Sequence, residues 1–224
     1  MNRLTRLVSL SGLIFAALVL ATFPGPTEPN AKASGARVIS FFVADRTAER
    51  TGAVLFTLGT VFLVFFAGYL CSRIRESDSS ALGVVALVGV GIAGAGLLIS
   101  ASTTWVLTDA PTHYSRAGAQ VIDALGNDTV LPVLAGVIVF AIATGIAFVR
   151  ERWLPAWLGW ILIAFGLISP SPLAVFGLFG VVAWSAVVAV LGVTRSRPPQ
   201  AMQAPLGSAA ARSRAATLAH QPER

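Results

Sequence analysis

Five long stretches of this sequence contain no charged residue. The stretches without Asp, Glu, Lys or Arg are 7–27, 51–72, 79–108, 129–149 and 153–194. Charged residues make up only 12% of the chain and hydrophobic residues 55%, so the charges are concentrated between these stretches. A soluble helical domain carries charges along its exposed faces, whereas runs of about 20 apolar residues are typical of membrane-spanning helices. The pattern predicts a multi-pass integral membrane protein and excludes a soluble enzyme.

The five stretches predict six transmembrane helices in an all-α bundle, because backbone groups in lipid must be hydrogen-bonded within helices. The last stretch is twice the length of one crossing, and prolines at 170 and 172 divide it into two helices. The predicted spans are 7–23, 51–71, 81–102, 129–149, 154–168 and 172–193. Because 154–168 is short for a full crossing, a re-entrant helix is the alternative there.

The basic residues predict the orientation of these spans. With the N-terminus in the cytoplasm, eleven of the sixteen basic residues fall on the cytoplasmic side. Pairs of arginines follow or precede helix ends on that side, as the positive-inside rule requires. We therefore expect a plasma-membrane protein with both termini in the cytoplasm. The net charge of +6 then follows from topology, and it requires no nucleic acid as a partner.

Both ends of the chain have features of their own. Residues 1–23 have a basic start and an apolar run, and Ala31-Lys32-Ala33 fits a cleavage site for a signal peptide. The length of the apolar run and its distance from this site favour a retained first span, with cleavage as the alternative. Residues 195–224 are rich in Pro, Ala, Ser, Gln and Arg and predict a disordered basic cytoplasmic tail after a membrane domain at 1–194.

Two segments on the outer side predict short helices at the membrane interface. In 37–50, Val38, Phe41 and Phe42 share one face, whereas the other face is polar. We expect this amphipathic helix to lie at the outer interface and to run into the second span. Residues 103–128 predict another short helix before the fourth span.

The predicted spans contain hydroxyl groups but no charged side chain. Hydroxyl groups in the spans or next to their ends include those of Thr57, Thr60, Tyr69, Ser100, Thr103, Thr104, Thr144, Ser169 and Ser185. Such groups usually bond to their own helix or to a neighbouring helix, and the absence of charges argues against a proton-coupled pump. Pairs of small residues four positions apart, Gly89/Ala93, Gly91/Ala95 and Ala141/Gly145, predict close helix packing. The glycine-rich third span is expected to lie centrally in the bundle.

The candidate polar cluster on the outer surface consists of Asp109, His113, Asp123 and Asp128. A histidine with carboxylates has the ligand chemistry of a divalent metal site. However, the spacing matches no established ligand pattern, and the other histidine, His220, is expected on the opposite side. We therefore expect solvated loop residues without a metal or cofactor, and Asp128 is expected to cap the fourth span.

Residues 150–160 read Arg-Glu-Arg-Trp-Leu-Pro-Ala-Trp-Leu-Gly-Trp. Together with Ile39–Asp45 and Val61–Gly68, this motif resembles a broad family of multi-pass membrane proteins common in actinobacteria, over about residues 37–193. The family has no established activity, so the resemblance implies the membrane fold and no catalytic residue. Pro155 can begin a helix without losing a hydrogen bond. The motif predicts an anchor at the inner interface, made of Arg150, Arg152, Trp153, Pro155, Trp157 and Trp160.

The sequence predicts a non-enzymatic protein, because no nucleophile, base or ligand cluster lies within the spans. The first hypothesis is a structural or accessory component whose partners are lipid and other membrane subunits. The alternative is a small transporter or channel for a neutral or apolar solute. A polar cavity lined by Thr57, Thr60, Thr104 and Thr144 would favour transport, whereas a dry core would favour the accessory role.

Overall fold

The computed structural model describes residues 3–23, 25, 29–30, 32–75, 80–151, 154–170 and 174–194, which form eight α-helices. The helices are α1 (Arg3–Thr22), α2 (Gly35–Ala44), α3 (Arg46–Arg75), α4 (Ser80–Asp109), α5 (Arg116–Asp128), α6 (Val130–Glu151), α7 (Ala156–Ile168) and α8 (Ala174–Thr194). Each of the six predicted spans coincides with one of them, and the described part of the chain is all-α, as predicted. The predicted tail and Arg152 and Trp153 lie outside the described residues.

In the part of the chain that the structure describes, four helical segments are long and apolar enough to cross a membrane. They are Arg46–Arg75, Ser80–Asp109, Arg116–Glu151 and Phe176–Thr194. The third segment combines α5 and α6, because Thr129 between them keeps a helical backbone with φ −64° and ψ −9°. Leu10–Leu20 and Ala156–Ile168 are shorter apolar helices. The chain is therefore a multi-pass membrane protein by the length and composition of its helices.

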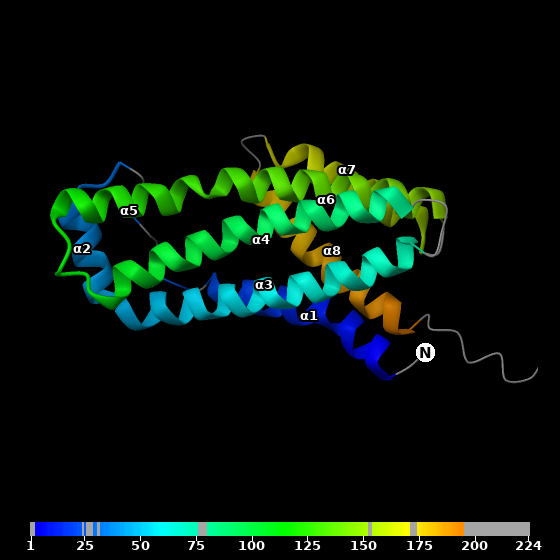
Figure 1. Ribbon diagram of the computed structural model, residues 1–224, viewed down its shortest axis with the longest axis horizontal. Coiled ribbons are helices and arrows are strands. Elements are labelled where there is room, and N and C mark those ends of the chain that lie inside the picture. Colours follow the sequence, from blue (N-terminus) through cyan, green and yellow to red (C-terminus); the bar gives the residue numbers. More distant parts are fainter. Residues whose placement is uncertain are drawn as a thin grey trace, which may run out of the picture.

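Six of the helices form a closed ring in which each helix packs on the next, in the order α1, α3, α4, α6, α7, α8 and back to α1 (Figure 1). The interior of this ring is filled by large buried side chains, including Phe66, Phe148, Leu162, Trp184 and Val188. The indole Nε1 of Trp184 donates a hydrogen bond to the carbonyl of Leu158 on α7 at 2.9 Å. The ring therefore has one continuous core, to which all six helices contribute.

Glycine allows the closest approaches within the ring. A Cβ on Gly89 of α4 would lie 2.6 Å from the backbone nitrogen of Phe140, and a Cβ on Gly136 of α6 would collide with the backbone of Ala93. On its other side, α6 packs on α7, where a Cβ on Gly159 would lie 2.6 Å from the carbonyl of Gly145. The predicted close packing at Gly89/Ala93 and Ala141/Gly145 is thus confirmed. Gly91 and Ala95, in contrast, are exposed. The expectation that the third span lies centrally is wrong, because α4 is one of the ring helices, between α3 and α6, and exposes Val84, Val88 and Ile99.

The long helices extend past the ring at one end and form a second, smaller unit, which we call the lobe. The lobe consists of α2, α5 and the adjoining ends of α3 and α4, and lies at the left in Figure 1. Its core contains Val38 and Phe42 from α2, Leu107 from α4 and Ala119 from α5. The apolar face of α2 therefore packs on protein. The opposite end of the molecule, where the described chain begins at Arg3 and ends at Thr194, is called the terminal end.

Two sequence predictions for this region need correction. The helix predicted over 37–50 is interrupted, because α2 ends at Ala44 and Asp45 separates it from Arg46, which begins α3. The helices that contain the second and third predicted spans also extend beyond those spans, since α3 and α4 have 30 residues each, or about 45 Å of helix. Residues 46–50 and 103–109 continue these helices into the lobe, where they pack on α2 and α5.

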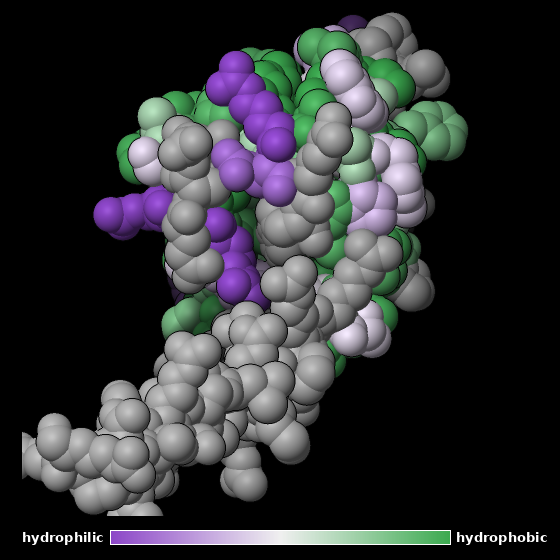
Figure 2. Space-filling view, turned by 90° about the vertical axis from the view of Figure 1, so that its right-hand side faces the viewer, coloured by the Kyte–Doolittle hydropathy of each residue, from purple (hydrophilic) through white to green (hydrophobic). Residues whose placement is uncertain are grey.

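The exposed apolar surface marks the part of the molecule that fits a bilayer. On α4 it extends from Val84 to Val106, a distance of about 33 Å along the helix, close to the hydrocarbon thickness of about 30 Å. Seen from the terminal end, hydrophilic side chains gather on the end face and hydrophobic residues surround it (Figure 2). Arg73 and Arg75 of α3 and Arg150 of α6 lie in the last turns of their helices at this end.

The helix α7 is shorter than its neighbours. Its 13 residues measure about 20 Å, and a Cβ on Gly166 near its end would lie 3.7 Å from the carbonyl of Ile138. Since α6 begins at Val130, α7 ends about two turns before α6 does on the lobe side. The hairpin of α7 and α8 starts and ends at the terminal end (Figure 1), so the chain returns to the same side whether α7 crosses completely or is re-entrant.

Candidate functional site

The structure does not gather the four residues of the predicted polar cluster. His113 and Asp128 are exposed, Asp123 is buried in α5, and Asp109 ends α4. Among the residues that the structure describes, no group of three or more His, Cys, Asp or Glu side chains is close enough to hold a metal ion. Asp128 is the last residue of α5 and is followed without a loop by Thr129 and α6, so it is not an N-cap preceding a separate helix as predicted.

Asp109 instead contacts two arginines at the start of α3. A guanidinium nitrogen of Arg46 donates to the backbone carbonyl of Asp109 at 2.6 Å, and a nitrogen of Arg50 lies 3.5 Å from its carboxylate. The guanidinium of Arg50 also lies 4.3 Å from the centre of the Trp105 ring, a cation–π contact. We call Arg46, Arg50, Trp105 and Asp109 the arginine cluster. It fixes two cationic side chains at the boundary between the ring and the lobe.

A surface groove of about 390 Å³ begins at the arginine cluster and lies between α3 and α4. It is lined by Ala53, Val54, Thr57 and Leu58 of α3 and by Ala101, Ser102, Trp105 and Val106 of α4. Ala53 and Ala101 are buried, whereas Val54, Leu58 and Val106 are exposed. Trp105 belongs to both the arginine cluster and the groove, so the charged and apolar surfaces are continuous.

The hydroxyl groups in the groove are bonded within their own helices. Thr57 donates to the carbonyl of Ala53 at 2.8 Å, and Ser102 donates to the carbonyl of Leu98 at 2.7 Å. Hydrogen bonds of this kind satisfy the hydroxyl proton and leave the methyl or methylene group facing outward. The groove therefore presents a mainly apolar surface.

Of the four threonines that would line a transport path, Thr57 alone lines the groove between α3 and α4. Thr57 faces the surface groove, Thr60 is buried and donates to the carbonyl of Phe56 at 2.9 Å, and Thr104 is half-buried. Thr144 is fully buried, and its hydroxyl has no hydrogen-bond partner among the described residues; the hydroxyl of Tyr69 shares this property. Among the described residues of the ring interior, these two hydroxyls are therefore candidates to bond a ligand.

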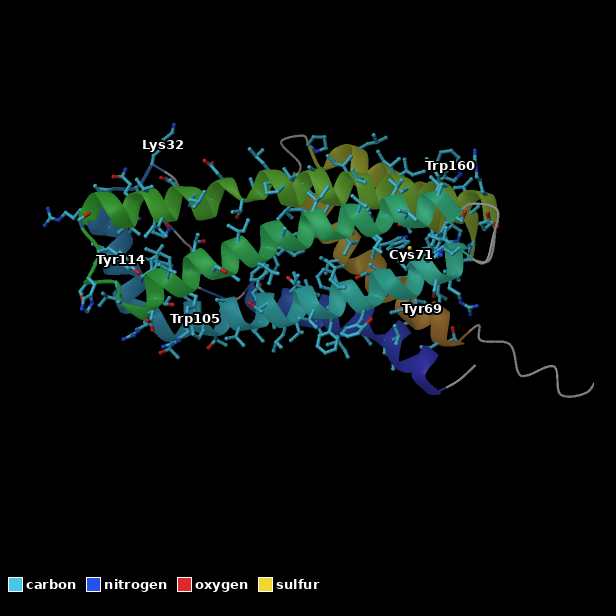
Figure 3. The ribbon with its side chains drawn as sticks, in the orientation of Figure 1. Lys32, Tyr69, Cys71, Trp105, Tyr114 and Trp160 are labelled. Carbon is cyan, nitrogen blue, oxygen red and sulfur yellow. The ribbon has the colours of Figure 1, made fainter. Side chains whose placement is uncertain are left out.

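The described part of the predicted anchor lies at the terminal end. Arg150 is exposed in the last turn of α6, and Pro155 precedes the first residue of α7, as the sequence predicts for a helix start. Trp157 and Trp160 are 54% and 61% exposed. Trp105 and Trp160 lie toward opposite ends of the bundle (Figure 3), which is the distribution of tryptophans at the two faces of a bilayer.

Sequence reasoning found Asp109 but not its partners. Arg46 and Arg50 are one helical turn apart, a spacing that predicts a shared face, but 59 residues separate Arg50 from Asp109. The sequence signal for an arginine contact at Asp109 is Trp105, which lies four residues earlier on the same helix and contacts Arg50 as well. Comparisons of the chain with protein-family models, with curated proteins and with solved structures found no match.

Proposed function

We propose that this protein is an accessory component of the plasma membrane. It binds lipid or partner helices through the exposed apolar surface of its helices. Six segments would cross the bilayer, with both termini in the cytoplasm. The observation that supports this role is the filled interior of the ring, where Phe66, Phe148 and Trp184 occupy the centre. The resemblance around Trp157-Leu158-Gly159-Trp160 supports the further proposal that the chain belongs to the actinobacterial family, which assigns it no activity.

The alternative function is transport of a neutral or apolar solute, and it draws on the buried hydroxyl of Thr144. Purified protein in liposomes tests the two functions directly. We expect efflux of glycerol and of small apolar dyes to match that of protein-free liposomes, because bulky side chains fill the path. Trp184→Ala, which opens the core, serves as the leaky control. Wild-type efflux above the background that Thr144→Val abolishes would overturn the accessory role.

The orientation is tested with a reporter that is active only in the cytoplasm, fused after Arg224. The first and last described residues lie at the same end of the ring, which supports an even number of crossings. We expect an active fusion, and we expect the same reporter to be inactive when inserted at Thr112 between α4 and α5. An expressed but inactive fusion after Arg224 would contradict the proposed topology.

A further inference from the structure

The arginine cluster has the hydrogen-bond donors to bind one phosphate diester. Arg46 and Arg50 place two guanidinium groups at the mouth of the groove, where Asp109 contacts both, and Asp45 and the buried Glu49 are the acidic residues next to them in the sequence. Asp109 contacts one nitrogen of each guanidinium, and an arginine has five N–H donors, so donors remain for a further acceptor. The side chain of Arg50 is 40% exposed and that of Asp109 62% exposed, so the cluster is accessible from outside the protein.

The groove lies at the depth where a lipid acyl chain begins. The exposed apolar surface of α4 ends at Trp105 and Val106, next to the arginine cluster. Tryptophan and arginine are found together at the headgroup level of membranes, and Figure 3 places Trp105 toward the lobe end of the bundle. From that level the surface groove continues along α3 and α4, away from the lobe, to Leu58 and Ala101.

We propose that this surface is a binding site for one phospholipid of the leaflet on the lobe side. The lipid phosphate contacts Arg46 and Arg50, and one acyl chain lies in the groove over Ala53 and Ala101, beside Trp105. Charge complementarity with the phosphate and the apolar lining of the groove select this ligand over an uncharged lipid and over a free phosphate ion. The inference rests on the proposed lipid-binding role and identifies the class of lipid.

Native mass spectrometry of the full chain in a mild detergent tests the site. The protein is titrated with phosphatidylglycerol, with a diacylglycerol of the same acyl chains, and with glycerophosphate. We expect one phosphatidylglycerol to bind about tenfold more tightly than the diacylglycerol, the scale of a charge-assisted hydrogen bond. Glycerophosphate, which lacks acyl chains, is expected not to bind.

Two variants address the two halves of the site, each with a matched control. Arg50→Gln removes the charge and is compared with Arg37→Gln on α2, and Ser102→Phe fills the groove and is compared with Ala164→Phe on α7. We expect each site variant, but neither control, to lower phosphatidylglycerol affinity by about tenfold. Arg50→Lys keeps the charge and is expected to retain part of the affinity, which separates loss of the site from misfolding.

Three results would overturn the inference. They are equal affinities for phosphatidylglycerol and diacylglycerol, equal losses in the site variants and their controls, and binding of glycerophosphate as tight as that of the lipid. The third result would identify a surface anion site. Solute efflux from liposomes measures a different property, so failure of the accessory role and failure of this lipid site are distinguishable.

Discussion

At the scale of single residues, the ring depends on where a Cβ atom is absent. Gly89 and Gly91 are two positions apart on α4, yet only Gly89 meets another backbone. The sequence presents them as two equivalent small-residue pairs, with Ala93 and with Ala95. Which pair packs is decided by the direction in which α6 approaches, and that direction depends on contacts far apart in the sequence. The pairs were predictable, whereas their division into a packed and an exposed pair was not.

The two glycines give a matched prediction of stability. Gly89→Ala is expected to lower the free energy of unfolding by about 1–3 kcal/mol, because its methyl group would force α4 and α6 apart. Gly91→Ala, with no atom within 4 Å of the new Cβ, is expected to be neutral or slightly stabilising. Thermal unfolding of both variants in the same detergent provides the measurement. A larger loss for Gly91→Ala than for Gly89→Ala would contradict the packing described.

At the scale of helices, the sequence predicts the ring better than the lobe. Five charge-free runs predict the six ring helices, with α7 and α8 sharing the last run, because lipid imposes the same requirement on every crossing. The lobe is held together by α2, α4 and α5, which meet through Val38, Leu107 and Ala119. The amphipathic face of α2 was predictable from its spacing, but the spacing is the same whether the face packs on lipid or on protein. The contact between Arg50 and Asp109 is equally a product of the tertiary fold.

Phe42 tests whether the lobe is a separate core. Phe42→Ala is expected to destabilise the packing of α2 by about 3–5 kcal/mol, because Phe42 is 2% exposed in the lobe core. Hydrogen exchange should then accelerate at amides of α2 and α5 while the amides of α7 and α8 keep their protection. The control is Val43→Ala, since Val43 is 50% exposed and should change little. Equal acceleration throughout the ring would show that the lobe does not unfold separately.

At the scale of the whole molecule, the exposed apolar surface of α4 measures about 33 Å along the helix. A bilayer that differs from this thickness must deform or tilt the helices, at a cost of fractions of a kcal/mol per Å. We expect the unfolding temperature in lipid nanodiscs to be highest for acyl chains that give a hydrocarbon thickness near 30 Å. It should fall for both shorter and longer chains. A steady rise with chain length would contradict the match between this surface and the hydrocarbon layer.

The two long helices that run from the ring into the lobe, α3 and α4, give the lobe a mechanical property. The segment Arg116–Glu151 measures about 54 Å and contains a turn residue, Thr129, and Pro132 near the boundary with the ring, whereas α3 and α4 cross that boundary without a break. Two unbroken helices, α3 and α4, thus join the lobe to the ring in place of a flexible neck. The lobe must turn when the ring turns, so the surface of the lobe keeps a fixed orientation relative to the membrane plane.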